Sequence, residues 1–304
     1  MIVIDVEKRR IEARYINKIR PIFKQINKDA IALYRATKNI PSDSLARNYT
    51  PDFLKVIKDA LRETIQMFGY NERKPAIKSV SEIPDDELDK INREFEQLAI
   101  LFIASESERQ AIFIQNTNAR ELSDAQLNGI VKYTRKEARL IDIIQKLKEK
   151  LSRISFANTI NGTSVNLSKL EAKIKEYEDA LENLRQEKEV AIEEAIKEEL
   201  EDQEDARAEL IASVVVGSGE SWSREQEMLL IAGALTLLGK QVFKTWQGIL
   251  DGRIRLSHFA ATGQKVPVNQ DFIVGGYQAS RPRDPRLPMS EVANCRCVVS
   301  YSVV

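Results

Sequence analysis

Apolar residues recur at helical spacing along much of the chain. Residues 5–40 carry a stripe of apolar side chains, most of them three or four positions apart: Ile11, Tyr15, Ile19, Phe23, Ile26 and Ile31. This period predicts one amphipathic helix. Pro21 lies inside the stripe and predicts a bend or a split, because proline has no amide proton for the helix interior.

Two further helices are predicted before the middle of the chain. Thr50-Pro51 is typical of a helix start, since the hydroxyl can cap the first turn and proline needs no donor there. We expect this helix to extend to about Met67 and residues 70–82 to form a loop. The next helix is predicted to start near Pro84, where three acidic residues suit the helix dipole, and to run through Phe102.

The middle of the chain predicts a helical hairpin. Two capping boxes are present, Ser123 to Gln126 and Ser168 to Glu171. Each is followed by a seam of about two heptads: Leu140, Ile144, Leu147, Leu151 and Ile154, then Leu170, Ile174, Tyr177, Leu181 and Leu184. A polar stretch with an Asn161-Gly162 turn signal separates the seams. We therefore expect antiparallel arms at about 123–156 and 167–212.

The pattern changes toward the C-terminus. Gly217 and Gly219 are expected to end the second arm. From Lys240 onward the helical period weakens, prolines and glycines become denser, and nine basic residues stand against four acidic ones. The β-branched residues after Cys297 predict a terminal strand.

The predicted fold is therefore mainly α. It combines a helical N-terminal region at 1–122, a long antiparallel helical hairpin at 123–212 and a small α+β module at 213–304. Eight acidic residues cluster at 193–205. Such a run is typical of a solvated helix face, and it also suits a surface that repels DNA or docks a basic partner.

Composition narrows the classes of protein that fit. Lys and Arg together number 46, as do Asp and Glu, so the net charge is zero, which argues against a wholly basic nucleic-acid coat. Two cysteines are too few for a disulfide framework, so we expect a reducing compartment. No secretory signal is recognisable at the N-terminus. The longest apolar run, near 228–239, is about half of the ~20 residues that a membrane span requires. We expect a soluble protein made in the cytoplasm.

The residues best suited to chemistry lie close together in the last sixty positions. The single histidine, His258, and both cysteines, Cys295 and Cys297, are all there. They are three soft metal ligands, and a closed zinc site needs a fourth, for which Asp251, Asp271, Asp284 or a water molecule are candidates. The alternative is that the three side chains are hydrogen-bonded parts of a small polar core.

Two further hypotheses concern a catalytic cysteine and the arginines of the tail. A catalytic cysteine needs a base or a positive field, which His258 and Arg296 can supply, but no Gly-rich oxyanion loop accompanies the cysteines. Arg253 and Arg255 share a face if their segment is extended. These two arginines, with those at 281, 283 and 286, suit surface salt bridges or contact with phosphate or an acidic protein surface.

Residues 206–304 resemble the C-terminal module of the phage Mu F-like head-morphogenesis family. The resemblance is carried by the order and spacing of Lys244, Trp246, Asp251, Arg253, Arg255, His258, Gly263, Asn294, Cys295, Arg296 and Cys297. The family consists of minor head proteins of tailed phages.

The resemblance implies a structural protein of the virion head with no catalytic residues and no required cofactor. Its implied partners are the portal or major capsid protein, with packaged DNA as a further one, and several copies are expected in each virion. It implies a place at the portal vertex or in the head interior after synthesis in the host cytoplasm. Two alternatives stay open: a metal-dependent nuclease-like enzyme built on His258 and the cysteines with zinc as cofactor, and a DNA-binding protein ejected with the genome.

The chain departs from the family pattern in two places. The family often carries Ile-Ala-x-Thr-Glu upstream, whereas Ile211-Ala212 is followed here by Ser213-Val214, so the role of the Thr-Glu pair is not carried over. The hairpin predicted at 123–212 is also longer than the family's usual helices. We interpret it as an insertion that reaches a partner or the packaged DNA.

Overall fold

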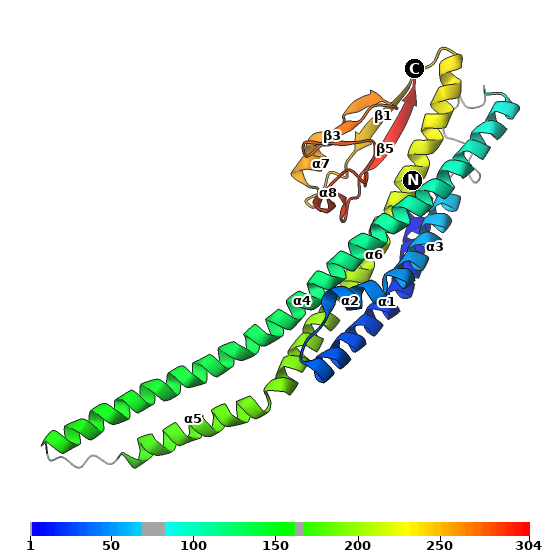
Figure 1. The fold of residues 1–304 in the computed structure, drawn as a ribbon. Coiled ribbons are helices and arrows are strands. Elements are labelled where there is room, and N and C mark those ends of the chain that lie inside the picture. The colour runs from blue at the N-terminus through cyan, green and yellow to red at the C-terminus, as the bar shows by residue number, and fades with distance from the viewer. Residues whose placement is uncertain (1, 69–82, 162–166) are drawn as a thin grey trace. The chain divides into compact units, whose positions relative to one another are not determined.

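The computed structural model describes residues 2–68, 83–161 and 167–304. It is mainly helical, with a small antiparallel sheet near the C-terminus (Figure 1), which confirms the predicted fold class. The predicted loop at 70–82 and the glycine of the Asn161-Gly162 turn lie outside the described residues. None of the described helices is both long enough and apolar enough to cross a membrane.

Within the described residues, six helices precede the sheet. They are α1 (Ile2–Thr37), α2 (Ser42–Asn48), α3 (Thr50–Phe68), α4 (Asp85–Asn161), α5 (Ser168–Gln186) and α6 (Lys188–Leu237). The starts predicted at Thr50 and near Pro84 are confirmed. The chain forms two compact units, the first made of Met1–Phe23, Asn48–Gln115 and Glu204–Val304, the second of Lys24–Arg47 and Asn116–Gln203.

The helical part of the first unit is held by aromatic packing. Phe23 on α1 contacts Phe53 on α3, with ring centroids 5.3 Å apart. Trp222 on α6 stacks on Phe102 of α4 at 4.4 Å and 10°, and its other neighbour is Phe95 at 5.6 Å. These rings are all nearly inaccessible to solvent, so one set packs α1 against α3 and the other packs α6 against α4.

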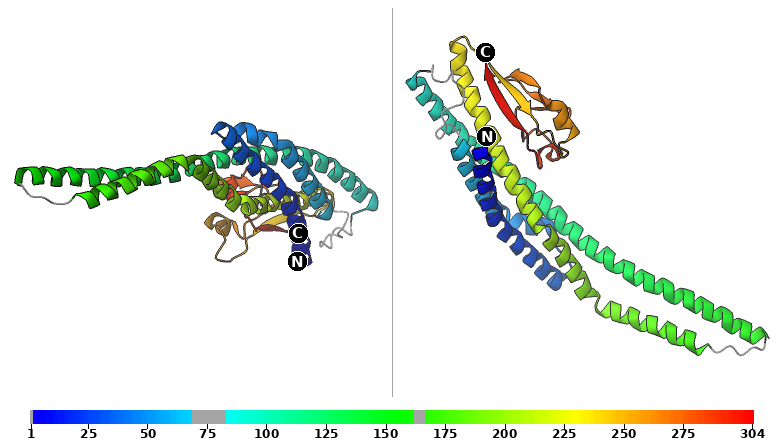
Figure 2. Two further views of the ribbon diagram at one scale, coloured as in Figure 1. Left: turned by 90° about the horizontal axis from the view of Figure 1, so that it is seen from below. Right: turned by 180° about the vertical axis from the view of Figure 1, so that it is seen from behind.

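The second unit contains the helical hairpin. Every residue of the two predicted seams is less exposed than its immediate neighbours in the sequence, and Ile144 and Ile174 are buried. Lys148 of α4 pairs with Glu178 of α5 at 2.6 Å, and Glu137 pairs with Arg185 at 2.9 Å. Because rising numbers on one helix meet falling numbers on the other, the arms are antiparallel, as predicted (Figure 2).

Two predicted helix boundaries are wrong, and the split that Pro21 could cause does not occur. Helix α1 continues through Pro21, whose ring is exposed. The helix is kept intact because Ile19 and Phe23, on either side of the proline, are fully buried. Ser123 starts no helix and lies inside α4, where Leu122 and Ala125 are buried. A capping residue lowers the cost of a helix start, but burial of its neighbours outweighs that preference at this position.

Gly217 and Gly219 do not end the second arm, since both lie inside α6. Their missing side chains let Arg283 and Thr64 approach the helix closely. The second arm is instead interrupted at Glu187. The ion-pair partners also change there. Helix α5 pairs with α4, whereas the start of α6 also pairs with Arg35 of α1 through Glu193 and with Lys38, just after α1, through Glu189. The division of the chain near residues 123 and 213 stays a prediction.

The C-terminal part of the first unit is a small α+β module. Its strands are β1 (Val242–Gln247), β2 (Lys265–Pro267), β3 (Phe272–Val274), β4 (Tyr277–Ala279) and β5 (Val298–Val303), with short helices α7 (Leu256–Ala261) and α8 (Met289–Val292). An antiparallel sheet has the order β2-β1-β5, and β3-β4 form a hairpin. The predicted terminal strand is confirmed as β5, which pairs with β1 so that Trp246 lies opposite Val299.

Candidate metal centre

The lone histidine and both cysteines converge at one point of the module. His258 lies on α7, whose end is formed by Gly263 at φ 87°, a conformation that glycine adopts without strain. Cys295 and Cys297 lie on the turn that leads into β5. Since β5 pairs along the whole of β1, this register carries the turn to the same end of the module as α7.

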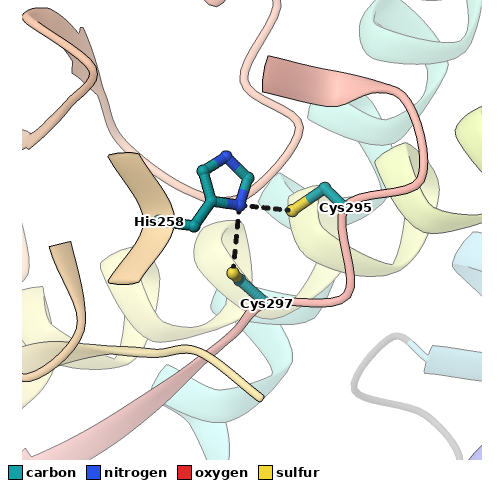
Figure 3. Close-up of side chains that lie close together, drawn as sticks. All are labelled: His258, Cys295 and Cys297. Atoms are coloured by element: carbon teal, nitrogen blue, oxygen red, sulfur yellow. Dashed lines mark hydrogen bonds between the residues drawn. The ribbon is translucent and has the colours of Figure 1, made fainter. Parts of the chain in front are cut away.

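The three side chains face one another (Figure 3). Nδ1 of His258 lies 3.3 Å from Sγ of Cys297 and 3.7 Å from Sγ of Cys295. The three donor atoms all lie within 4.8 Å of one another. All three residues are at most 4 % exposed. Two sulfur donors and one nitrogen donor at this spacing could bind a metal ion.

The opposite nitrogen of the imidazole faces a carboxylate. Nε2 of His258 lies 3.0 Å from Oε2 of Glu291 on α8, which is ion-pair distance without the alignment of a good hydrogen bond. Ser257 donates a 2.7 Å hydrogen bond to the same oxygen of Glu291. The imidazole is therefore held with Nδ1 toward the sulfurs and Nε2 toward Glu291.

Buried apolar side chains pack around the cluster. The indole of Trp246 is fully buried and meets the His258 ring edge-on at 5.8 Å. Phe272 packs against the other side of Trp246, at 5.3 Å and 75°. Both cysteines belong to this core, so the donors are shielded from solvent.

The turn that carries the cysteines is fixed by its motif residues. Asn294 adopts φ 54°, a left-handed conformation that asparagine tolerates. Arg255 donates a hydrogen bond to the carbonyl of Ala293. Arg296 binds Asp251 through two hydrogen bonds of 2.7 Å. The residues that carry the family resemblance thus hold the turn from both sides.

Arg283 connects this turn to helix α6. Its backbone has φ 60°, its side chain is 4 % exposed, and it donates a hydrogen bond to the carbonyl of Cys295. The guanidinium crosses α6 at Gly217, where a Cβ atom would overlap it. The small residue on α6 therefore allows a buried cation to support the cysteine turn.

The two thiols share their protons unequally. A hydrogen bond from Cys297, aided by His258 and the Arg283 charge, holds the pKa of Cys295 well below its usual range despite burial. The same interaction with Cys295, together with burial, raises the pKa of Cys297. The two shifts are opposite in direction because the thiols interact with each other, and a bound divalent cation would require both of them to be deprotonated.

None of the three aspartates proposed as a fourth ligand is part of the cluster found among the described residues. Asp251 is bound to Arg296, and this hydrogen bond holds the pKa of its carboxyl well below the usual range. Asp271 and Asp284 both bind Arg286, at 2.6 and 2.7 Å. Arginine pairing therefore keeps these carboxylates in other interactions.

The arginines of the tail do not form one surface. Arg253 and Arg255 share no extended face, because their segment is a turn that leaves Arg253 81 % exposed and ties Arg255 to Ala293. Arg286 forms the predicted surface salt bridges, whereas Arg281 and Arg283 are buried. The glycines and prolines around them fold this loop back onto α6.

Sequence reasoning missed a buried charge network beside the metal centre. Lys244, 1 % exposed, donates a 2.8 Å hydrogen bond to the carbonyl of Ser280 and lies 3.5 Å from Glu225 of α6. Glu225 also accepts hydrogen bonds from Arg281 and from Ser280. Strand alternation was the available signal, since Lys244 and Trp246 fall on the same buried face of β1. Nothing in the sequence pointed to Glu291.

No protein family, no curated protein and no solved structure matches this chain.

Proposed function

We propose that this protein is a minor head protein of a tailed bacteriophage, which joins the head during assembly by docking on the portal and carries out no reaction. The proposal extends the resemblance of residues 206–304 to the Mu F-like module. Its support is that the motif residues engage one another: Asp251 with Arg296, His258 with the cysteines, and Arg255 with the cysteine turn. Residues that hold a framework together suit a docking module.

One surface of the module carries the docking role. Leu256 and Phe259, three residues apart and therefore on one face of α7, are 87 % and 57 % exposed. Large apolar side chains gathered on one surface are typical of sites that bind another protein. The buried side of the same helix presents His258 to the cysteines. Helix α7 thus joins a fixed interior to an apolar exterior.

The test is incorporation into heads. Phages lacking the protein would be complemented with wild-type protein, with a Leu256→Ser/Phe259→Ser variant, or with Leu237→Ser. Leu237, at the end of α6, is 84 % exposed and serves as the matched control. We expect the double variant to fold normally and be absent from heads, and Leu237→Ser to be incorporated.

Two results would each refute a different part of the proposal. Normal heads, DNA content and infectivity without the protein would remove the head role. Full incorporation of the Leu256→Ser/Phe259→Ser variant would remove the docking surface while leaving the head role intact.

A second candidate is a zinc-dependent nuclease-like enzyme, which the convergence of His258, Cys295 and Cys297 favours. Zinc is the metal that we infer from two sulfur donors and one imidazole. The burial of the cluster argues for a structural rather than a catalytic ion, because substrate must reach a catalytic one. Wild-type phage function with His258→Ala, together with no metal-dependent cleavage of DNA, would remove this candidate.

A further inference from the structure

We propose that His258, Cys295 and Cys297 hold one Zn²⁺ ion as a structural element of the C-terminal module. This inference goes beyond the proposed head role and does not depend on it. Zinc bonds of about 2.3 Å to sulfur and about 2.0 Å to nitrogen, in a tetrahedron, place sulfur and nitrogen about 3.5 Å apart. The two nitrogen–sulfur distances, 3.3 and 3.7 Å, lie on either side of that value.

The chemistry of the donors selects zinc over harder cations. Magnesium and calcium prefer oxygen ligands, whereas thiolate and imidazole suit zinc. Two thiolates also neutralise the charge of one Zn²⁺, and neutral His258 adds none. A neutral centre avoids the large cost of burying net charge, which fits donors that are at most 4 % exposed.

The histidine is oriented as metal-bound histidines are. Such residues usually turn their second nitrogen toward a carboxylate, which fixes the ring and strengthens the ligand. Glu291 occupies that place, with Oε2 3.0 Å from Nε2 and its position supported by Ser257. We therefore assign Glu291 as a positioning residue for the metal.

No fourth protein donor joins the cluster among the described residues. The nearby carboxylate of Asp251 is occupied by Arg296. The fourth ligand is therefore a small molecule such as water, and the ion is held by three protein atoms. Water in that place does not by itself imply catalysis, because the donors are shielded by Trp246 and its core.

The ion would join segments that are far apart in sequence. His258 and the cysteines are 37 and 39 residues apart, so the metal closes a long loop of an otherwise small core. The Arg283 hydrogen bond to Cys295 extends the same connection to α6 at Gly217. Removal of the metal should accordingly loosen the module and leave the helical hairpin of the second unit folded.

The first test measures metal directly in the full-length, reduced protein. We expect close to one zinc per chain by elemental analysis after purification without chelators. Protein stripped of metal with a chelator should then be titrated with Co²⁺. The titration should give tetrahedral d–d bands and thiolate-to-cobalt charge-transfer bands that saturate at one equivalent, and Zn²⁺ should abolish these bands by displacing the cobalt. A folded, reduced chain that shows neither zinc nor this cobalt spectrum would overturn the proposal and leave a hydrogen-bonded thiol–imidazole cluster.

Variants test the assignment of each ligand. Cys295→Ser, Cys297→Ser and His258→Asn should each abolish the one-equivalent cobalt spectrum, whereas Asp271→Asn should retain it, because Asp271 is in the same module but pairs with Arg286 outside the cluster. Glu291→Gln should keep the spectrum but weaken zinc affinity about 10–100-fold. If Asp271→Asn loses the metal and Cys297→Ser keeps it, the assigned ligand set is wrong. Unchanged zinc affinity in Glu291→Gln would remove the positioning role alone.

Discussion

Replacement of Gly217 by alanine tests how the module is attached to α6. In an exposed helix interior this change normally stabilises, because alanine exceeds glycine by about 1 kcal/mol in helix propensity. At Gly217 the added Cβ would lie 2.6 Å from Nη1 of Arg283 and closer still to two other atoms of that side chain. The buried guanidinium would have to move.

The cost of that movement follows from what Arg283 does. Its hydrogen bond to the carbonyl of Cys295 joins a charged donor to a buried acceptor, and such a bond contributes about 1.5–3 kcal/mol. Subtracting the gain in helix propensity leaves Gly217→Ala less stable than wild type by about 0.5–2 kcal/mol. Gly233 is exposed on the same helix, and a Cβ added there would have nothing within 4 Å. Gly233→Ala should therefore raise the free energy of unfolding by about 0.5–1 kcal/mol.

Urea unfolding followed by tryptophan fluorescence measures this difference, since both tryptophans, Trp222 and Trp246, belong to the first unit. The two identical substitutions should shift the midpoint in opposite directions. In an Arg283→Ala background, Gly217→Ala should become stabilising, because the overlapping group is gone. The reasoning would be refuted if both glycine substitutions shifted the urea midpoint equally, or if Gly217→Ala still lowered stability in the Arg283→Ala background.

Three other substitutions have expected outcomes of their own. Trp222→Ala should lower the free energy of unfolding by about 3–5 kcal/mol, because the ring is 5 % exposed and stacked on Phe102; a loss below about 1 kcal/mol in urea titration would contradict that packing. Pro21→Ala should raise stability by up to about 3 kcal/mol by restoring an amide donor inside α1, seen as a higher unfolding midpoint. Asp251→Asn should flatten the acid dependence of unfolding. The Arg296 hydrogen bond lowers the folded-state pKa of Asp251, so its contribution is full above an unfolded pKa of about 3.9 and is lost as the pH falls below it. The gap between wild type and Asp251→Asn should therefore narrow in midpoints measured on either side of pH ~4, and a constant gap would count against the pairing.

The residue types predicted part of the candidate metal site. Cys295, Cys297 and His258 were recognisable as soft ligands, and the structure brings them together. Asp251, one of the aspartates expected as a fourth ligand, does not join the cluster, because it is hydrogen-bonded to Arg296. Which carboxylate faces a histidine depends on turns that bring distant segments together, so Glu291 had no signal of its own.

The hydrophobic period by itself determined which faces of the helices are buried. The stripe of α1, the seam residues Ile144 and Ile174, and the strand β5 were all predicted, because a period of 3.6 or 2 reports burial locally. Tertiary structure decided where helices end and which polar groups are buried. Gly217, Ser123 and Pro21 carry local signals for helix ends or breaks, yet packing on both sides of each one keeps its helix intact. The convergence of His258 with the cysteines required closing a loop of 37 residues, which only the pairing of β1 with β5 and the support of α6 provide.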